Sequence, residues 1–245
     1  MNASLDPTEY GRLPSGRHRL TREAVLASQR GRLLEACVQV IAEKGYAATT
    51  VADIVARAGV SRRTFYEQFP DKQACFLAAY DTGVEVVLVT IREAIDAVPV
   101  DDWRARARAS VETFMEVLAV EPAFAQALHI ETFAAGPAAL RRRAEVFGLI
   151  AELWRGLHAR ARVQDRRLMT LPDEAFLALV GGLDELIREC LRTRGAAALP
   201  ELAEPALSVV FAFLGRRNPP RVEVRWGPVG PGSAEETGPA PSNRS

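Results

Sequence analysis

The chain has 245 residues with 31 basic and 31 acidic side chains, so its formal net charge is zero, and 48% of its residues are hydrophobic. This length accommodates one small and one medium domain, each with a buried core. The balanced charge excludes a protein that is basic throughout, so any nucleic-acid binding requires positive charge concentrated in one part of the chain.

The charge is in fact unevenly distributed. Residues 10–72 carry 11 basic and 6 acidic side chains, whereas residues 73–217 carry 17 basic and 20 acidic ones. Phosphate contacts depend on local basic surplus. The sequence therefore predicts that an interface with nucleic acid, if there is one, lies in the N-terminal third.

Cysteine usage and hydropathy restrict the class of protein further. Cys37, Cys75 and Cys190 lie on apolar helical faces without C-x-x-C spacing, so we expect neither a disulfide framework nor a metal site. No secretory leader opens the chain, and no apolar run approaches the roughly 20 residues of a membrane helix. We therefore expect a cytoplasmic protein without a membrane segment.

The first elements in chain order are an arm and a helix. Residues 1–20 contain proline, glycine and three arginines without periodicity, which predicts a flexible arm. The alternative is that these arginines, Arg12, Arg17 and Arg19, enter a DNA minor groove. From about 21 to 44, apolar residues recur at helical spacing, and Gly45 ends this first helix.

Residues 50–69 then give two short helical patterns joined by a tight turn. Thr50 and Asp53 form a capping-box pattern at the start of the first helix. Gly59 lies where that helix must stop, since glycine adopts the left-handed conformation of a tight turn at little cost. Ser61 is placed to cap the second helix, whose buried stripe is Phe65 and Phe69. This arrangement is a helix-turn-helix, in which the second helix enters the major groove of DNA.

Side chains on the outer face of the second helix suit that groove. Arginine makes bidentate bonds to guanine and also neutralises phosphates. Lys72, one of only two lysines, begins the next helix, where free N–H groups already favour a phosphate. The expected DNA-contacting set is Thr49, Thr50, Ser61, Arg62, Arg63, Thr64, Tyr66, Gln68 and Lys72, with Thr49, Thr50 and Lys72 assigned to phosphates.

The segment from about Leu33 to Leu77 resembles the DNA-binding domain of TetR-family transcriptional regulators. The resemblance is carried by Gly45-Tyr46, Thr49-Thr50, Asp53-Ile54, Ala58-Gly59-Val60-Ser61, Phe65-Tyr66, Phe69 and Lys72. Two positions depart from the commonest form, because Arg63 stands where many members have glycine and Gln68 where many have histidine. Both positions lie on the expected DNA face, so they bear on which operator sequence is bound.

The remainder of the chain is also predicted to be helical. A long helix from 73 to about Pro99 is followed by helices at about 103–120, 122–134, 137–163, 172–193 and 201–215. We expect an all-α fold of about nine helices. It comprises a three-helix DNA-binding domain at 21–72, a ligand-binding and dimerisation domain at 73–217, and a disordered tail at 218–245.

The last two predicted helices are apolar around most of their circumference, which requires burial on more than one side. One side is assigned to the domain core and the other to a second copy of the chain, with Gly181-Gly182 permitting close approach. The alternative is an internal pair in a larger monomer. The TetR resemblance also implies a homodimer, here through about 172–194 and 201–215.

The resemblance further implies a small-molecule inducer among the central helices that tilts the long helix and separates the two reading heads. Aromatic residues offer a mostly apolar lining, and His129, Glu131 and Thr132 supply candidate polar groups. Each lining residue alone is equally explained as core. The candidate lining residues are Trp103, Phe114, Met115, Phe124, Phe133, Phe147, Trp154 and Phe176.

The sequence predicts a homodimeric DNA-binding regulator, a repressor of a palindromic operator that a small apolar inducer releases. One alternative is an architectural or protein-responsive DNA binder that meets no small molecule. Another is an all-α enzyme, but no nucleophile–base or metal-ligand pattern occurs. Carboxylate pairs such as Asp184-Glu185 are explained as solvated or capping groups. We therefore expect no catalysis and no cofactor beyond an unidentified effector.

Overall fold

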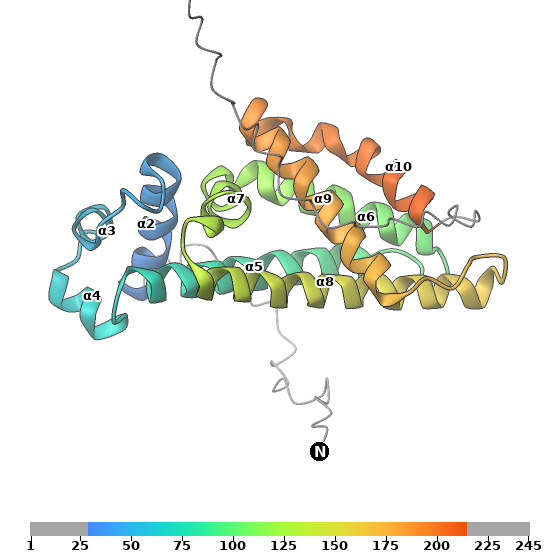
Figure 1. The fold of residues 1–245 in the computed structure, drawn as a ribbon, viewed down its shortest axis with the longest axis horizontal. Helices are drawn as coiled ribbons and strands as arrows, with labels where there is room; N and C mark the ends of the chain where they lie inside the picture. Colours follow the sequence, from blue (N-terminus) through green and yellow to red (C-terminus); the bar gives the residue numbers. More distant parts are fainter. Residues whose placement is uncertain (1–28, 215–245) are drawn as a thin grey trace, which may run out of the picture.

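A computed structural model of the chain describes residues 29–214, and within that range the protein is all-α (Figure 1). The described residues form nine α-helices and two short 3₁₀ helices, with no strand. The expected all-α fold, with a helix-turn-helix unit followed by a larger helical part, is confirmed. The elements are α2 (Gln29–Lys44), α3 (Val51–Ala58), α4 (Arg62–Gln68), α5 (Lys72–Asp96), α6 (Trp103–Val120), α7 (Pro122–His129), η1 (Glu131–Phe133), α8 (Pro137–Gln164), α9 (Asp173–Thr193), η2 (Ala196–Leu202) and α10 (Ala203–Phe213).

The helices begin where short polar side chains accept the free N–H groups of a first turn. Asp71 accepts the N–H of Ala74 at the start of α5, and Asp102 accepts that of Ala105 at the start of α6, at 2.8 and 2.9 Å. Helices α7 and α8 instead begin with proline, whose missing N–H leaves no donor unsatisfied there. These starts lie within one residue of the predicted ones.

Helices α2 to α4 form a unit at one end of the molecule, here called the reading unit (Figure 1). Its core also takes in the first two turns of α5, including Cys75 and Phe76. The boundary expected at residue 72 therefore falls at the start of an unbroken helix, which carries the chain from the reading unit into the rest of the protein. The buried centre of the unit comprises Leu33, Cys37, Ile41, Ile54, Phe65, Cys75 and Phe76.

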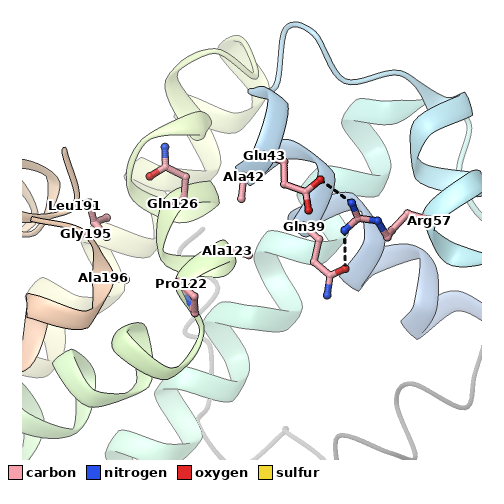
Figure 2. A pocket seen from close by; sticks show the side chains of 10 residues that line it. All are labelled: Gln39, Ala42, Glu43, Arg57, Pro122, Ala123, Gln126, Leu191, Gly195 and Ala196. Atoms are coloured by element: carbon pink, nitrogen blue, oxygen red, sulfur yellow. Dashed lines mark hydrogen bonds and ion pairs between the residues drawn. The ribbon is translucent and has the colours of Figure 1, made fainter. Parts of the chain in front are cut away.

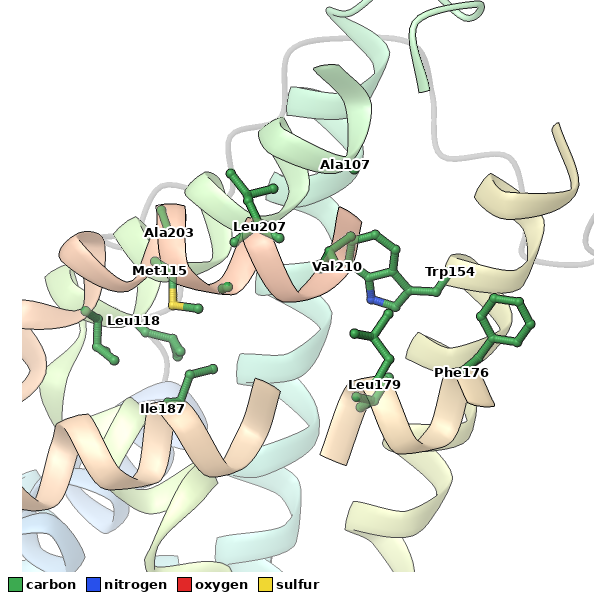
Figure 3. Packing of buried hydrophobic residues seen from close by; sticks show 14 of the residues in the cluster. Ala107, Met115, Leu118, Trp154, Phe176, Leu179, Ile187, Ala203, Leu207 and Val210 are labelled. Carbon is green, nitrogen blue, oxygen red and sulfur yellow. The ribbon is translucent and has the colours of Figure 1, made fainter. Parts of the chain in front are cut away.

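The second core lies among α6, α8, α9, η2 and α10, which with α5 and α7 make up the regulatory part. Met115 and Leu118 of α6 face Ile187 of α9 and Leu207 of α10 (Figure 3). Trp154 of α8 lies near Phe176 and Leu179 of α9 in the same cluster. Burial of such large apolar side chains stabilises the fold by roughly 1.5–3 kcal/mol each.

Two predicted helices differ in detail from the structure. The helix expected at 122–134 ends at His129, and Glu131–Phe133 continue it as a 3₁₀ turn. The helix expected at 201–215 is α10, preceded by the 3₁₀ helix η2. The expected arm at 1–20, the residues 21–28 of the first predicted helix and the tail at 218–245 lie outside the described residues.

The helices predicted to form the dimer interface each bury one apolar side and expose another. Ala206, Leu207 and Val210 of α10 pack into the protein's own core, so this helix is apolar because α6 and α9 cover it. Large exposed apolar residues lie on α8 and α9, which pack against each other, and also on α10. The exposed side chains are Leu140, Leu149, Leu153 and Val163 on α8, Leu177 and Leu186 on α9, and Val209 on α10.

Two segments meet the length and composition criterion for a membrane span, which corrects the expectation that no apolar run is long enough. They are Lys72–Asp96 and Ala196–Phe213, of 25 and 18 residues. Core helices of globular proteins meet the same criterion. Both segments contribute buried residues to the cores described above, including Phe76 in α5 and Leu207 in α10.

Candidate DNA interface

The turn between α3 and α4 has the geometry that its sequence predicts. Thr50 Oγ1 accepts the N–H of Asp53, and the Asp53 carboxylate accepts the N–H of Thr50, which completes a capping box. Gly59 ends α3 with φ of 64°, a left-handed conformation that a side chain makes costly. Ser61 then caps α4 by accepting the N–H of Thr64 at 3.0 Å. The angle between the two helices is therefore encoded locally.

Helix α4 buries one face and exposes the other. Phe65 is fully buried and Phe69 nearly so, which holds the helix against α2 and α3. On the opposite side Arg62, Arg63, Tyr66 and Gln68 are exposed. Tyr66 has 58% of its surface exposed although its ring meets the edge of Phe65. An exposed aromatic flanked by arginines is suited to contact with the grooves and phosphates of DNA.

Three of the expected DNA contacts on α4 and its N-cap already have hydrogen-bond partners within the reading unit. The hydroxyls of Ser61 and Thr64 lie 2.9 Å apart and bond to each other. Arg63 forms an ion pair with Glu67 one turn on, at 2.9 Å, while its side chain stays 89% exposed. Such exposed pairs are weak and exchange readily with other partners. Arg63 is thus free to turn toward DNA, whereas Ser61 acts as a cap.

The structure removes Thr49 from the expected phosphate contacts. Its side chain is buried, and its hydroxyl donates to the carbonyl of Gly45 at 2.8 Å. Thr50 is exposed, but its hydroxyl donates to Asp53 at 2.7 Å as part of the capping box. The Thr-Thr pair therefore shapes the start of α3, and only the second residue lies at the surface.

Lys72 also has a structural role that the sequence did not predict. Its ammonium donates to the carbonyls of Tyr46 and Thr49, at 2.6 and 2.7 Å, and lies 4.1 Å from the centre of the Tyr46 ring. Partial burial lowers the pKa of Lys72 from its ordinary value. Two of the three N–H donors of the ammonium are occupied by these carbonyls. The lysine therefore joins α5 to the loop before α3.

Comparisons with known proteins agree with this geometry. Residues 33–79 match the family model described as bacterial regulatory proteins, tetR family. The transcriptional activator FasR of Mycolicibacterium smegmatis is 32% identical over 105 residues, which are 43% of this chain and 47% of FasR. The transcriptional regulator EthR of the same organism is 32% identical over 155 residues, 63% of this chain and 62% of EthR.

The chain belongs to the TetR family. It spans less than two thirds of the length of FasR and EthR. The fold is shared with the fatty acid degradation regulator FadR from Bacillus halodurans, with a TM-score of 0.68, 21% identity, and coverage of 77% of this chain and 97% of that one. FadR from Bacillus subtilis, solved in complex with stearoyl-CoA, has a TM-score of 0.66, 18% identity, and coverage of 75% and 98%.

In this TetR-family chain, most of the expected ligand-lining aromatics are packed in the core. Trp103, Trp154 and Phe176 are buried, and Phe114 is partly buried beside the ring of His129. Phe133 lies apart from them, 43% exposed. The guanidinium groups of Arg143 and Arg188 lie over its ring, at 4.9 and 4.5 Å from the centre. Seven of the eight expected lining residues therefore lie in or against one core cluster, and Phe133 lies outside it.

His129 belongs to a buried polar cluster that joins three helices. Its Nδ1 lies 2.7 Å from Asp184 Oδ1, and Arg143 binds the other oxygen of the same carboxylate. Burial raises the pKa of Asp184, but the hydrogen bond from His129 and the charges of His129 and Arg143 outweigh it, so the pKa is lowered. Asp184 therefore accepts from Nδ1. The other nitrogen, Nε2, is buried without a hydrogen-bond partner.

Asp184 was explained from the sequence as a solvated carboxylate, and this was wrong, because it is 5% exposed and ion-paired. The other two polar candidates serve different purposes. Thr132 is buried and donates to backbone carbonyls at the end of α7. Glu131 accepts the N–H of Tyr46 at 2.8 Å, and so connects the regulatory part to the reading unit.

A cleft of about 540 Å³ lies between the reading unit and the regulatory part (Figure 2). On one wall Arg57 of α3 pairs with Glu43 at 2.6 Å and with Gln39 at 3.3 Å. Pro122 and Gln126 of α7 lie on the other wall. None of the residues expected to line an inducer site borders this cleft. Among residues 29–214 no group of three or more His, Cys, Asp or Glu side chains is arranged to hold a metal ion.

Proposed function

We propose that this protein is a sequence-specific DNA-binding regulator of transcription that contacts duplex DNA through α4 and acts in the cytoplasm. The observation that carries the proposal is the exposed face of α4, with Arg62, Arg63, Tyr66 and Gln68, on a unit whose caps and core fix its orientation. Both curated relatives are named as transcriptional regulators, which supports the same function here.

We infer that the protein acts as a homodimer through α8 and α9. The proposed dimer face comprises exposed apolar side chains, including Leu149, Leu153 and Leu186, around glycines with open space beside them. Gly148, Gly156 and Gly182 have no atom within 4 Å of a Cβ built on them, so a partner helix can approach closely. Two-fold symmetry then gives a palindromic operator with half-sites about one helical turn apart or somewhat more.

We further propose that a small, mostly apolar effector binds in the regulatory part and releases a repressor from its operator. The stearoyl-CoA complex of the FadR structure, which has the same fold, supports an acyl-type effector as the first class to test. The buried His129 offers Nε2 to a polar group of such a molecule. Melting temperatures measured with stearoyl-CoA, stearate and free coenzyme A show whether the protein binds the fatty-acyl part or the nucleotide part of such a molecule.

The test of DNA binding is selection of random duplexes by the purified protein, followed by sequencing of the bound pool. A two-fold symmetric motif supports the proposal and gives the half-site spacing, whereas an unenriched pool from folded protein contradicts it. Transcription from a promoter carrying the motif then distinguishes repression from activation, which is the activity in the name of FasR. Strong binding that no candidate effector changes would favour an architectural or protein-responsive DNA binder.

A further inference from the structure

The segment α7–η1 belongs to both hydrophobic cores. Ala125 and Leu128 of α7 are buried in the regulatory core. Ala127 of the same helix is buried in the core of the reading unit, together with Ala135 just beyond η1. Cores are closely packed and resist continuous deformation, so a displacement of α7 is felt on both sides. This short segment is therefore the joint between the two parts.

A polar contact reinforces the joint at the loop that precedes α3. Glu131 in η1 accepts the N–H of Tyr46 at 2.8 Å across 85 residues of sequence. The carbonyl of Tyr46 accepts Lys72 Nζ at 2.6 Å. A carboxylate from the regulatory part and an ammonium from α5 thus hold the two backbone groups of one residue, and charge makes both hydrogen bonds stronger than neutral ones. A second contact joins Gln73 to the carbonyl of Ala135 at 2.7 Å.

We propose that Glu131 is a positioning residue for the reading unit. Through its contact with Tyr46, the position of α7 in the regulatory part determines the orientation of the helix-turn-helix. Displacing α7 withdraws Glu131 from Tyr46 and frees the loop that leads into α3. The reading unit then loses the fixed orientation that a dimer needs to bind both half-sites of an operator. This inference rests on the proposed function, because it assigns a regulatory route to the same DNA-binding site.

The opposite end of α7 offers a way to displace it without knowing the effector. The ring of Phe124 lies directly over Gly83 of α5, and a Cβ at Gly83 would be 2.0 Å from Phe124 Cε2. No pair of non-bonded carbon atoms tolerates that distance, so Gly83→Ala forces the Phe124 ring out of its position against α5. Gly83→Ala therefore perturbs the packing of α7 against α5 without any effector.

The first experiment compares Glu131→Ala, Glu131→Gln and Glu131→Asp in the full chain. Glutamine keeps an acceptor at the same reach, whereas aspartate is one methylene shorter. We expect hydrogen exchange of the peptides covering 45–50 to rise about tenfold in the alanine and aspartate variants and to stay near the original rate in the glutamine variant. Operator affinity, measured on the selected duplex, falls about tenfold in the same two variants. Glu116→Ala, an exposed carboxylate on α6, is the matched control.

The second experiment tests transmission through α7. Gly83→Ala is expected to raise exchange at 45–50 and to weaken operator binding, although residue 83 lies in the regulatory part. Adding Phe124→Ala removes the ring that the new methyl group displaces, so the double variant should recover most of the protection at 45–50. Exchange in α10, which packs against α6, η2 and α9, should stay constant throughout, which a general loss of stability would not allow.

The proposal is overturned if Glu131→Ala leaves both exchange at 45–50 and operator affinity unchanged. It is also overturned if the glutamine and alanine variants lose affinity equally, because the contact would then not depend on an acceptor. Where Glu131→Ala unfolds the protein, the glutamine and aspartate variants make the same comparison. If no operator can be selected while exchange at 45–50 still rises in the alanine variant, the proposed function fails and the positioning contact stands.

Discussion

Lys72 holds the loop before α3 through the backbone of Tyr46. Its ammonium donates to the Tyr46 carbonyl at 2.6 Å and lies 4.1 Å from the centre of the same residue's ring. The chain is rich in arginine and contains only two lysines, and one of the two occupies this position. A compact ammonium can turn its donors toward two adjacent carbonyls, whereas a planar guanidinium has a fixed donor geometry.

Lys72→Ala is therefore expected to destabilise the protein as well as to weaken DNA binding. It leaves the carbonyls of Tyr46 and Thr49 without their donor and removes the cation from the Tyr46 ring. We expect the free energy of unfolding to fall by about 1–3 kcal/mol in urea titrations. Lys72→Arg keeps the charge but not the geometry, and should recover only part of that loss. Unchanged stability in Lys72→Ala would contradict the structural role and leave phosphate binding as the role of this residue.

Thr50→Ala tests the capping box on its own. The substitution removes the side-chain acceptor for the N–H of Asp53 at the start of α3. Loss of such a cap costs about 1 kcal/mol, visible as a lower urea midpoint with an unchanged slope. Thr50→Ser retains the hydroxyl and serves as the control. Equal losses in the two variants would mean that the threonine methyl group, and not the hydroxyl, stabilises this helix start.

The elements predicted correctly are those whose signals lie within a few residues of one another. Thr50 and Asp53 are three apart, and Gly59 ends the same helix, so chain chemistry alone fixes the start and the end of α3. Thr49 stands beside Thr50 with the same side chain, yet its hydroxyl turns inward to Gly45. Nothing in the sequence separates the two residues, because the difference depends on how α2 and α3 pack.

Contacts distant in sequence were the ones missed. Glu131 was singled out as a pocket residue, and its partner Tyr46 lies 85 residues away. Asp184 has its acidic neighbour Glu185 on the exposed side of α9, so the pair looked solvated until α7 and α8 supplied His129 and Arg143. The side of α10 predicted to face the protein's own core does so through Leu207 and Val210, while Val209 on the same helix is 41% exposed.

Asp184→Asn should test the buried cluster that α7, α8 and α9 share. Removing the charge leaves Arg143 without its carboxylate in a mostly buried site, which costs about 3 kcal/mol. The folded-state pKa of Asp184 lies below the ordinary value of 3.8, so its stabilising contribution is complete above 3.8 and disappears as pH falls through the folded value. Urea titrations should show a constant gap between the two proteins from about pH 7 to about pH 5, narrowing below 3.8. A gap that widened on acidification would contradict this assignment.

Tyr66→Ala is expected to weaken operator binding without lowering stability. The side chain is 58% exposed, and its ring touches Phe65 only at an edge, so the core of the reading unit survives the truncation. Loss of an aromatic contact to DNA should reduce affinity about tenfold in fluorescence anisotropy titrations. Retained affinity would exclude Tyr66 from the interface.

Arg63→Gly addresses which sequence is chosen. Arg63 reaches solvent from the outer face of α4, held only by an exposed pair with Glu67. If its guanidinium contacts a base edge, the selected motif should become less specific at one position of each half-site. Glycine also weakens the helix, so Arg63→Ala accompanies it as the variant that keeps helix propensity. The same motif with uniformly lower affinity would instead mark Arg63 as a phosphate contact.

Leu153→Arg tests the proposed dimer face. Leu153 is 53% exposed on α8, one turn from the open position of Gly156, where a partner helix can approach. A charge buried between two copies without a partner would cost several kcal/mol, so light scattering after size exclusion should show a monomer. Val120→Arg, at an equally apolar and 73% exposed site on α6, should leave the dimer intact. Because a dimer contacts both half-sites together, the monomer should bind a single half-site as before but lose at least about a hundredfold in affinity for the full palindrome. A dimer that persisted in Leu153→Arg would place the interface on another surface.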